Sequence, residues 1–138
     1  MAIKLINTRT RPSTSLPWHD PALSDDWINA NAENSDKIVT DGTIEAENII
    51  EKDEGLTQVK TWIYEDMDSM IKCQRDIVPT DLRRKQRTYR RSNGFTGSLQ
   101  IIDLDTDAEI PISVVHARET EMKSSGILEA DVEYFIPL

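Results

Sequence analysis

The segment that decides the fold is residues 55–77, GLTQVKTWIYEDMDSMIKCQRDI, which predicts a β-strand leading directly into an amphipathic helix. Residues 56–64 are rich in Thr, Val, Trp, Ile and Tyr, the side chains that suit a pleated sheet. Glu65 and Asp66 then supply carboxylates that can accept hydrogen bonds from the first N–H groups of a helix. A helix of about three turns is unstable alone, so we expect it to pack on a sheet containing the preceding strand.

Other segments with the composition or alternation of strands are the expected partners of this unit. They lie at residues 2–7, 43–52, 95–103, 110–117 and 126–138. A tight connection at residues 53–55 predicts an antiparallel hairpin with the central strand. Residues 79–92 predict a second helix, which begins after Pro79 and ends at Asn93-Gly94. The expected fold is α+β, a mixed or antiparallel sheet of about five or six strands with one or two helices.

The chain of 138 residues fits a single domain, residues 1–138, with an extended N-terminal arm at residues 8–21. The arm, TRTRPSTSLPWHDP, contains three prolines and no apolar periodicity. Trp18 near its end is a candidate anchor for a pocket on a partner. The alternative is that Trp18 folds back and covers an open end of its own sheet.

Charge is unevenly distributed along the chain, although the net value is −9. Residues 20–68 are mainly acidic, and residues 75–91 are mainly basic, which favours attraction between surfaces of opposite sign. No apolar run reaches the roughly 20 residues that span a bilayer, and the start lacks the core of a secretion signal. We therefore expect a soluble protein of the cytoplasm or of a virion, with no membrane partner.

No set of residues in the sequence predicts a catalytic, cofactor or metal site. The acidic residues 103–109 resemble a calcium loop, but Ala108 stands where that loop needs glycine, so an acidic turn is the better interpretation. His19, His116 and Cys73 are too far apart in sequence to predict a zinc site or a nucleophile with its base.

The basic stretch LRRKQRTYRR, residues 82–91, is the strongest functional signal in the sequence. It allows a solvated or internally paired helix, a docking face for carboxylates of another protein or copy, or nucleic-acid binding through phosphates. The net negative charge weakens the last of these. The predicted partner-binding residues are Trp18, Arg83, Arg84, Arg87, Arg90 and Arg91.

Two resemblances add to this reading. Residues 56–77, with their strand and acid-capped helix, resemble the second half of a ferredoxin-like domain of the dimeric α/β-barrel family. That resemblance implies helices on one side of a sheet and a tendency to pair edge to edge. The whole chain, with the proline-rich start MAIKLINTRTRPSTSLPW, resembles small uncharacterised virion proteins of large tailed bacteriophages. This second resemblance implies a capsid, neck or tail component, and neither carries over a catalytic residue.

The sequence thus predicts a non-enzymatic structural subunit of a larger assembly, such as a bacteriophage virion, bound to copies of itself or to other assembly proteins. One alternative is a small ferredoxin-like enzyme or ligand-binding dimer, with an apolar pocket between sheet and helix and a polar group such as His116 in it. The other alternative is a nucleic-acid-binding accessory protein.

Overall fold

A computed structural model describes residues 2–23, 25, 43–77, 80–132 and 134 of the chain. They contain an antiparallel sheet of four strands in the order β2-β3-β1-β4. The strands are β1 (Ile3–Thr10), β2 (Thr43–Lys52), β3 (Thr57–Tyr64) and β4 (Thr96–Asp103). The predicted α+β, ferredoxin-like fold is confirmed, with four strands in place of five or six.

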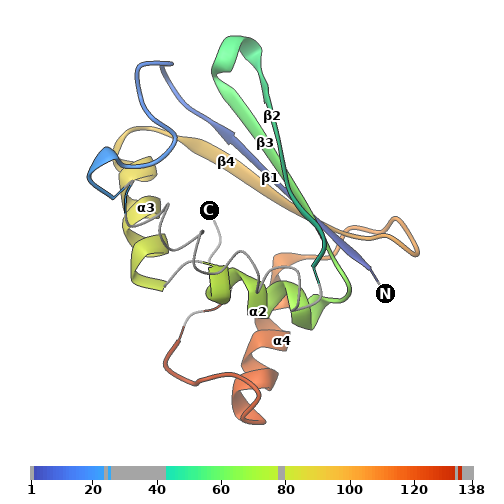
Figure 1. The fold of residues 1–138 in the computed structure, drawn as a ribbon. Coiled ribbons are helices and arrows are strands. Elements are labelled where there is room, and N and C mark those ends of the chain that lie inside the picture. Colours follow the sequence, from blue (N-terminus) through green and yellow to red (C-terminus); the bar gives the residue numbers. More distant parts are fainter. Residues whose placement is uncertain (1, 24, 26–42, 78–79, 133, 135–138) are drawn as a thin grey trace.

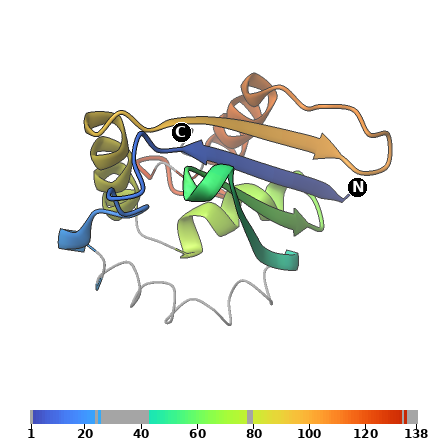
Figure 2. The same cartoon turned by 90° about the horizontal axis from the view of Figure 1, so that it is seen from above.

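Three helices lie together on one face of this sheet (Figure 1 and Figure 2). They are α2 (Met67–Ile77), α3 (Thr80–Ser92) and α4 (Ile112–Ser124), and short 3-10 turns occur at η1 (Pro21–Leu23) and η2 (Asp53–Gly55). None of these described helices is both long and apolar enough to cross a membrane. The opposite face of the sheet carries no described helix.

The strand and helix predicted in residues 55–77 form as expected. β3 leads into α2 through Glu65 and Asp66, and the backbone N–H of Ser69 donates to Asp66 Oδ1 at 2.8 Å, which caps the helix. The turn η2 joins β2 to β3 in the predicted hairpin. Its three residues all have positive φ, and Gly55 at +86° is the one suited to that conformation.

Two predicted strands are wrong. Residues 110–117 were expected to return as a strand, but Ile112 begins α4, whose buried side chains Val115, Glu119 and Met122 recur at helical spacing. Residues 126–132 and 134 form turns and irregular structure, although their alternation predicted a strand. Gly126 has a φ of +79° and turns the chain just after α4 ends.

The hydrophobic core occupies one end of the layer between sheet and helices. On the sheet it consists of Ile3 and Leu5 of β1 with Tyr64 and Ile101 of the neighbouring strands. The helices and the last described residues complete it with Met70, Ile71, Val115, Met122, Leu128 and Tyr134. The buried core residues on the helices therefore belong to α2 and α4.

Candidate functional site

The helix-facing side of β1 changes from apolar to polar midway along the strand. Ile3, Leu5, Asn7 and Arg9 alternate on this side and all four are buried. Asn7 is 6% exposed and Arg9 is 8% exposed. The sheet therefore buries polar side chains where an ordinary core would continue with apolar ones.

β3 repeats the same pattern next to β1. Lys60 lies opposite Asn7 and Gln58 lies opposite Arg9 in the register of the two strands. Both side chains are buried. Since partners in an antiparallel pair share one face of the sheet, these four residues form a continuous buried polar floor.

α3 and the loop after β1 add the remaining members of this site. The backbone N–H of Asp20 donates to Gln86 Oε1 at 2.9 Å, which ties the loop to the fully buried Gln86 of α3. His19 precedes Asp20 and lies within electrostatic range of Lys60, Arg9 and Arg90. We call this group the polar cluster, and its members are Asn7, Arg9, His19, Gln58, Lys60, Gln86 and Arg90.

Among the described residues, the charged side chains that act on His19 are Lys60, Arg9 and Arg90. Burial is the main cause that lowers the pKa of His19 from 6.5 to about 3, and the positive charges of Lys60, Arg9 and Arg90 lower it further. Burial, followed by the charge of Arg87, also lowers the pKa of Arg90 to about 10. At neutral pH His19 is therefore a neutral imidazole close to three cations.

Several buried atoms of the cluster have no hydrogen-bond partner among the described residues. These atoms are the amide oxygens of Asn7 and Gln58, the amide nitrogen of Gln86 and one terminal nitrogen of Arg90. A buried polar atom left without a partner costs about 1–3 kcal/mol. The cluster therefore offers both donors and acceptors to a bound molecule with polar groups.

Residues 11–20, which we call the strap, cross the end of the sheet beside the polar cluster. Arg11 donates from Nε to the carbonyl of Gly55 at 2.9 Å, and its guanidinium lies 4.2 Å from the centre of the Trp18 ring. Trp18 Nε1 donates to Glu51 Oε1 at 3.1 Å, and its ring packs edge-on against Phe95. The expected extended arm therefore folds back on its own domain, and partner binding through Trp18 stays a prediction.

The five predicted arginines do not share one surface. Arg83 is buried and donates from Nη1 to the carbonyl of Tyr134 at 2.6 Å, and Arg90 belongs to the polar cluster. Arg84 and Arg91 are exposed, and Arg87 is intermediate. The stretch that looked like one basic face thus points partly inward, and partner binding through its outward arginines stays a prediction.

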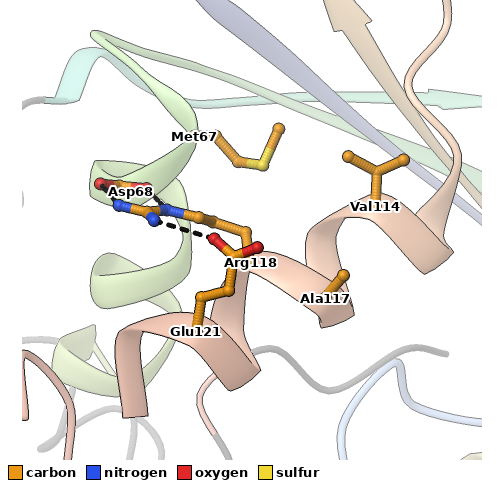
Figure 3. A pocket seen from close by; sticks show the side chains of 6 residues that line it. All are labelled: Met67, Asp68, Val114, Ala117, Arg118 and Glu121. Atoms are coloured by element: carbon orange, nitrogen blue, oxygen red, sulfur yellow. Dashed lines mark hydrogen bonds and ion pairs between the residues drawn. The ribbon is translucent and has the colours of Figure 1, made fainter. Parts of the chain in front are cut away.

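A groove lies between α2 and α4 (Figure 3). It is an open groove of about 390 Å³, lined by Met67, Asp68, Val114, Ala117, Arg118 and Glu121. Arg118 crosses it with a two-pronged pair to Asp68, both bonds 2.8 Å long, which lowers the pKa of that carboxyl. His116 of α4 does not line this groove, which lies between helices and not between sheet and helix as predicted.

Solved structures share this fold at low similarity. No family model matches the sequence, and no curated protein does either. SnoaB, a cofactor-independent oxygenase from Streptomyces nogalater, is 14% identical, with a TM-score of 0.41 over 74% of this chain and 91% of its own. A dimeric ferredoxin-like protein from an uncultured marine organism is 16% identical, with a TM-score of 0.45 over 75% and 96%. A protein assigned as an antibiotic biosynthesis monooxygenase from Nitrosomonas europaea is 9% identical, with a TM-score of 0.34 over 70% and 86%.

These findings correct two expectations. The bacteriophage virion assignment is wrong, because the structures similar to this chain are described as oxygenases and dimeric ferredoxin-like proteins. The expectation of a non-enzymatic structural subunit is contradicted by the same comparison. The likeness is one of fold, and it assigns no activity or residue role to this chain.

Sequence reasoning missed the polar cluster, because its members are scattered from β1 to α3. One signal was available in the alternation of the strands. Asn7 and Arg9 continue the face of Ile3 and Leu5, so a buried face that turns polar can be read from the sequence once the strand is extended to Thr10. The loop that brings His19 to this face has no such periodicity.

Proposed function

We propose that this chain binds a small organic molecule in the polar cluster, between the sheet and α3, and that the bound molecule is its substrate. The observation that carries this proposal is the set of buried amide atoms of Asn7, Gln58 and Gln86 that lack a partner among the described residues. Polar atoms in such surroundings are normally paired, and exceptions concentrate at sites with a function. The fold then serves as a scaffold, with the apolar end holding the sheet and helices together around the site.

A purely structural role for the cluster is less consistent with its composition. A core of the same volume made of apolar side chains avoids the desolvation of two buried cations and three amides. Buried polar groups that lower stability are retained where they bind something. The side chains of the cluster also come from separate parts of the chain, β1 with the strap, β3 and α3, and ligand sites are commonly built from several elements in this way.

The test uses Gln86, whose Nε2 is a buried donor within the cluster. The purified protein is incubated with an extract of small metabolites, and mass spectrometry identifies compounds that are retained and compounds that are depleted over time. We expect a compound that the wild type retains and consumes, and that Gln86→Leu neither retains nor consumes. Lys85→Leu, at an exposed position of the same helix, is the control and should behave as wild type. Identical extracts after wild type and Gln86→Leu would refute the proposal.

We also propose that two copies associate through the face of the sheet that points away from the helices. Ile6, Val59, Ile63 and Ile102 lie on this face by strand alternation, and each is only half-buried. Ile50 on the edge strand β2 is 56% exposed. An apolar stripe of this kind, on a sheet face that no described helix covers, favours burial against another copy.

Light scattering coupled to size-exclusion chromatography tests this association. The wild type should elute as a dimer, and Val59→Lys should give monomers because it places a charge in the centre of the stripe. Val114→Lys is the matched control, since Val114 is 45% exposed but lies on α4, away from this face. A wild type that stays monomeric at every concentration would rule this interface out.

A further inference from the structure

We infer that the strap is the lid of the polar cluster: residues 17–20 lift away from α3 to admit a molecule and close again over it. This inference rests on the proposed function, since it concerns how the proposed site is entered. Three features of the strap support it: where it is attached, which bonds attach it, and the residue that it shares with the site.

The strap runs from the end of the sheet to α3 (Figure 1 and Figure 2). At its start the backbone N–H of Arg11 donates to the carbonyl of Leu56 at 2.9 Å, beside the turn between β2 and β3. Further along, the hydroxyl of Tyr89 on α3 donates to the carbonyl of Pro17 at 2.7 Å. The strap is therefore fixed to the sheet at one end and to the helix layer at the other.

The polar cluster lies directly beside these attachments. Arg9 and Gln58 are partners in the register of β1 and β3, and they stand two residues from Arg11 and Leu56, which bond to each other. Near the other end of the strap, His19 has its Nδ1 buried. The strap therefore borders the cluster at its start and contributes a buried side chain to it near its end.

The bonds that hold residues 17–20 on α3 can break without unfolding the helix. Their helical partners are side-chain atoms, the hydroxyl of Tyr89 and the Oε1 of Gln86, so the backbone hydrogen bonds of α3 do not depend on them. Within the strap, the backbone N–H of Leu16 donates to the carbonyl of Ser13 at 3.2 Å, a local turn that can move as a unit. Segments attached in this way open at a lower free energy than paired strands.

Trp18 favours the closed position of the strap. Its Nε1 donates to Glu51 Oε1 at 3.1 Å, and its ring packs edge-on against Phe95 with the ring centres 5.9 Å apart. The guanidinium of Arg11 lies 4.2 Å from the centre of the same ring. Trp18 is only partly buried, so these contacts hold it at the surface, where it can detach without leaving a cavity in the core.

Gln86 belongs both to the attachment of the strap and to the proposed site. In the closed strap its Oε1 accepts the backbone N–H of Asp20 at 2.9 Å, which orients the Nε2 of the same amide. Nε2 is buried and has no partner among the described residues. A molecule that accepts a hydrogen bond from Nε2 therefore favours the closed strap, and by reciprocity the closed strap favours binding.

The first experiment measures whether opening of the strap exposes the cluster, with acetic anhydride as the probe. Lys60 of β3 is 6% exposed, so its amine should react when the strap is open, and the exposed Lys85 of α3 is the internal reference. Tyr89→Phe removes one bond that closes the strap, so acetylation of Lys60 relative to Lys85, read by peptide mass spectrometry, should rise about two- to tenfold. Thr88→Val is the matched control, because the hydroxyl it removes bonds to the carbonyl of Arg84 within α3, and it should behave as wild type.

The second experiment separates local opening from global unfolding. Amide hydrogen exchange followed by NMR compares the N–H of Asp20, which bonds to Gln86, with the N–H groups of β1, an interior strand. After correction for intrinsic rates, Asp20 should exchange about tenfold faster or more, and Tyr89→Phe should accelerate Asp20 without accelerating β1. Equal exchange at Asp20 and β1 would overturn the lid, and so would an acetylation of Lys60 that is the same in Tyr89→Phe and in wild type.

The lid and the proposed site fail separately. If wild type and Gln86→Leu treat the metabolite extract alike, the site is refuted even where Tyr89→Phe raises the acetylation of Lys60. If Tyr89→Phe leaves that acetylation unchanged, the lid is overturned even where wild type consumes a compound that Gln86→Leu does not.

Discussion

The two ends of the layer between sheet and helices are built on the same strands, but one end buries apolar side chains and the other buries polar ones. At one end Leu5 lies between Trp62 and Ile101 in the register, and the side chains facing it from α2 and α4 are apolar. At the other end Asn7 lies next to Lys60, and α3 covers the region with Gln86. On β1, the buried apolar Leu5 and the buried polar Asn7 are two residues apart, so the hydrophobic core and the polar cluster adjoin on this strand.

This difference separates stability from binding in space. Burial of apolar surface at the first end is the main source of folding free energy. The second end removes part of that free energy, because it holds charges and amides away from water. Substitutions at the apolar end should therefore lower the free energy of unfolding and leave ligand binding intact. Substitutions at the polar end should abolish ligand binding without lowering the free energy of unfolding.

The largest effect is expected for Leu5→Ala, at the apolar end. Leu5 is 2% exposed, and removing its branched side chain leaves a cavity in the core. The free energy of unfolding should fall by about 2–5 kcal/mol, measured by urea denaturation. Ligand retention by the folded fraction should persist, because the polar cluster keeps all its groups. Loss of binding without loss of stability would contradict the division between the two ends.

The second effect concerns pH and His19. The pKa of His19 is about 3 in the folded protein and near 6.5 in the unfolded chain, so only the unfolded chain takes up a proton as pH falls below 6.5. Stability should therefore be lost on acidification, by about 2 kcal/mol between pH 6.5 and pH 5. His19→Gln should lose less over the same interval, as measured by urea denaturation at each pH. An equal loss in both proteins would show that His19 is not buried as a neutral ring.

The third effect is expected for Asn7→Leu, which adds one more apolar side chain after Ile3 and Leu5 on the helix-facing side of β1. The buried amide oxygen of Asn7 has no partner in the described part of the chain, so its removal relieves a desolvation cost. We expect the free energy of unfolding to stay level or rise by about 1 kcal/mol, with loss of ligand binding. Ser113→Leu, at an exposed position of α4, provides the control for adding an apolar side chain to the surface. A marked fall in stability would mean that Asn7 is a structural member of the core.

The sequence could predict the elements whose signals are local. The run from Thr57 to Ile77 contains a strand composition, a capping carboxylate and helical spacing, and each is present in the structure. The segment 110–117 predicted a strand wrongly, because Ile, Val and Pro suit an edge strand as well as a helix that starts after Pro111. Only the burial of Val115 and Met122 against other elements decides between the two.

The candidate site could not be predicted, because it depends on tertiary placement. His19 reaches the cluster through the strap, which the sequence presents only as a proline-rich segment without periodicity. The burial of Arg83 and Arg90 also depends on tertiary placement. The sequence shows arginines around the whole helix and does not show which of them face inward. Composition indicates how many charges a helix has, while the contacts with β1, β3 and residue 134 determine which of them are buried.

The smallest effect on stability should come from the ion pair between Asp68 of α2 and Arg118 of α4, at the edge of the apolar end. Arg118 pairs with Asp68 through two bonds of 2.8 Å and with Glu121 at 3.2 Å, but the groups remain open to solvent. Exposed pairs of this kind add little to stability and are screened by salt. A double-mutant cycle with Asp68→Asn and Arg118→Met should therefore give a coupling of about 1 kcal/mol or less, and one that vanishes at about 1 M salt. A coupling that survives high salt would mean that the groove is closed to water.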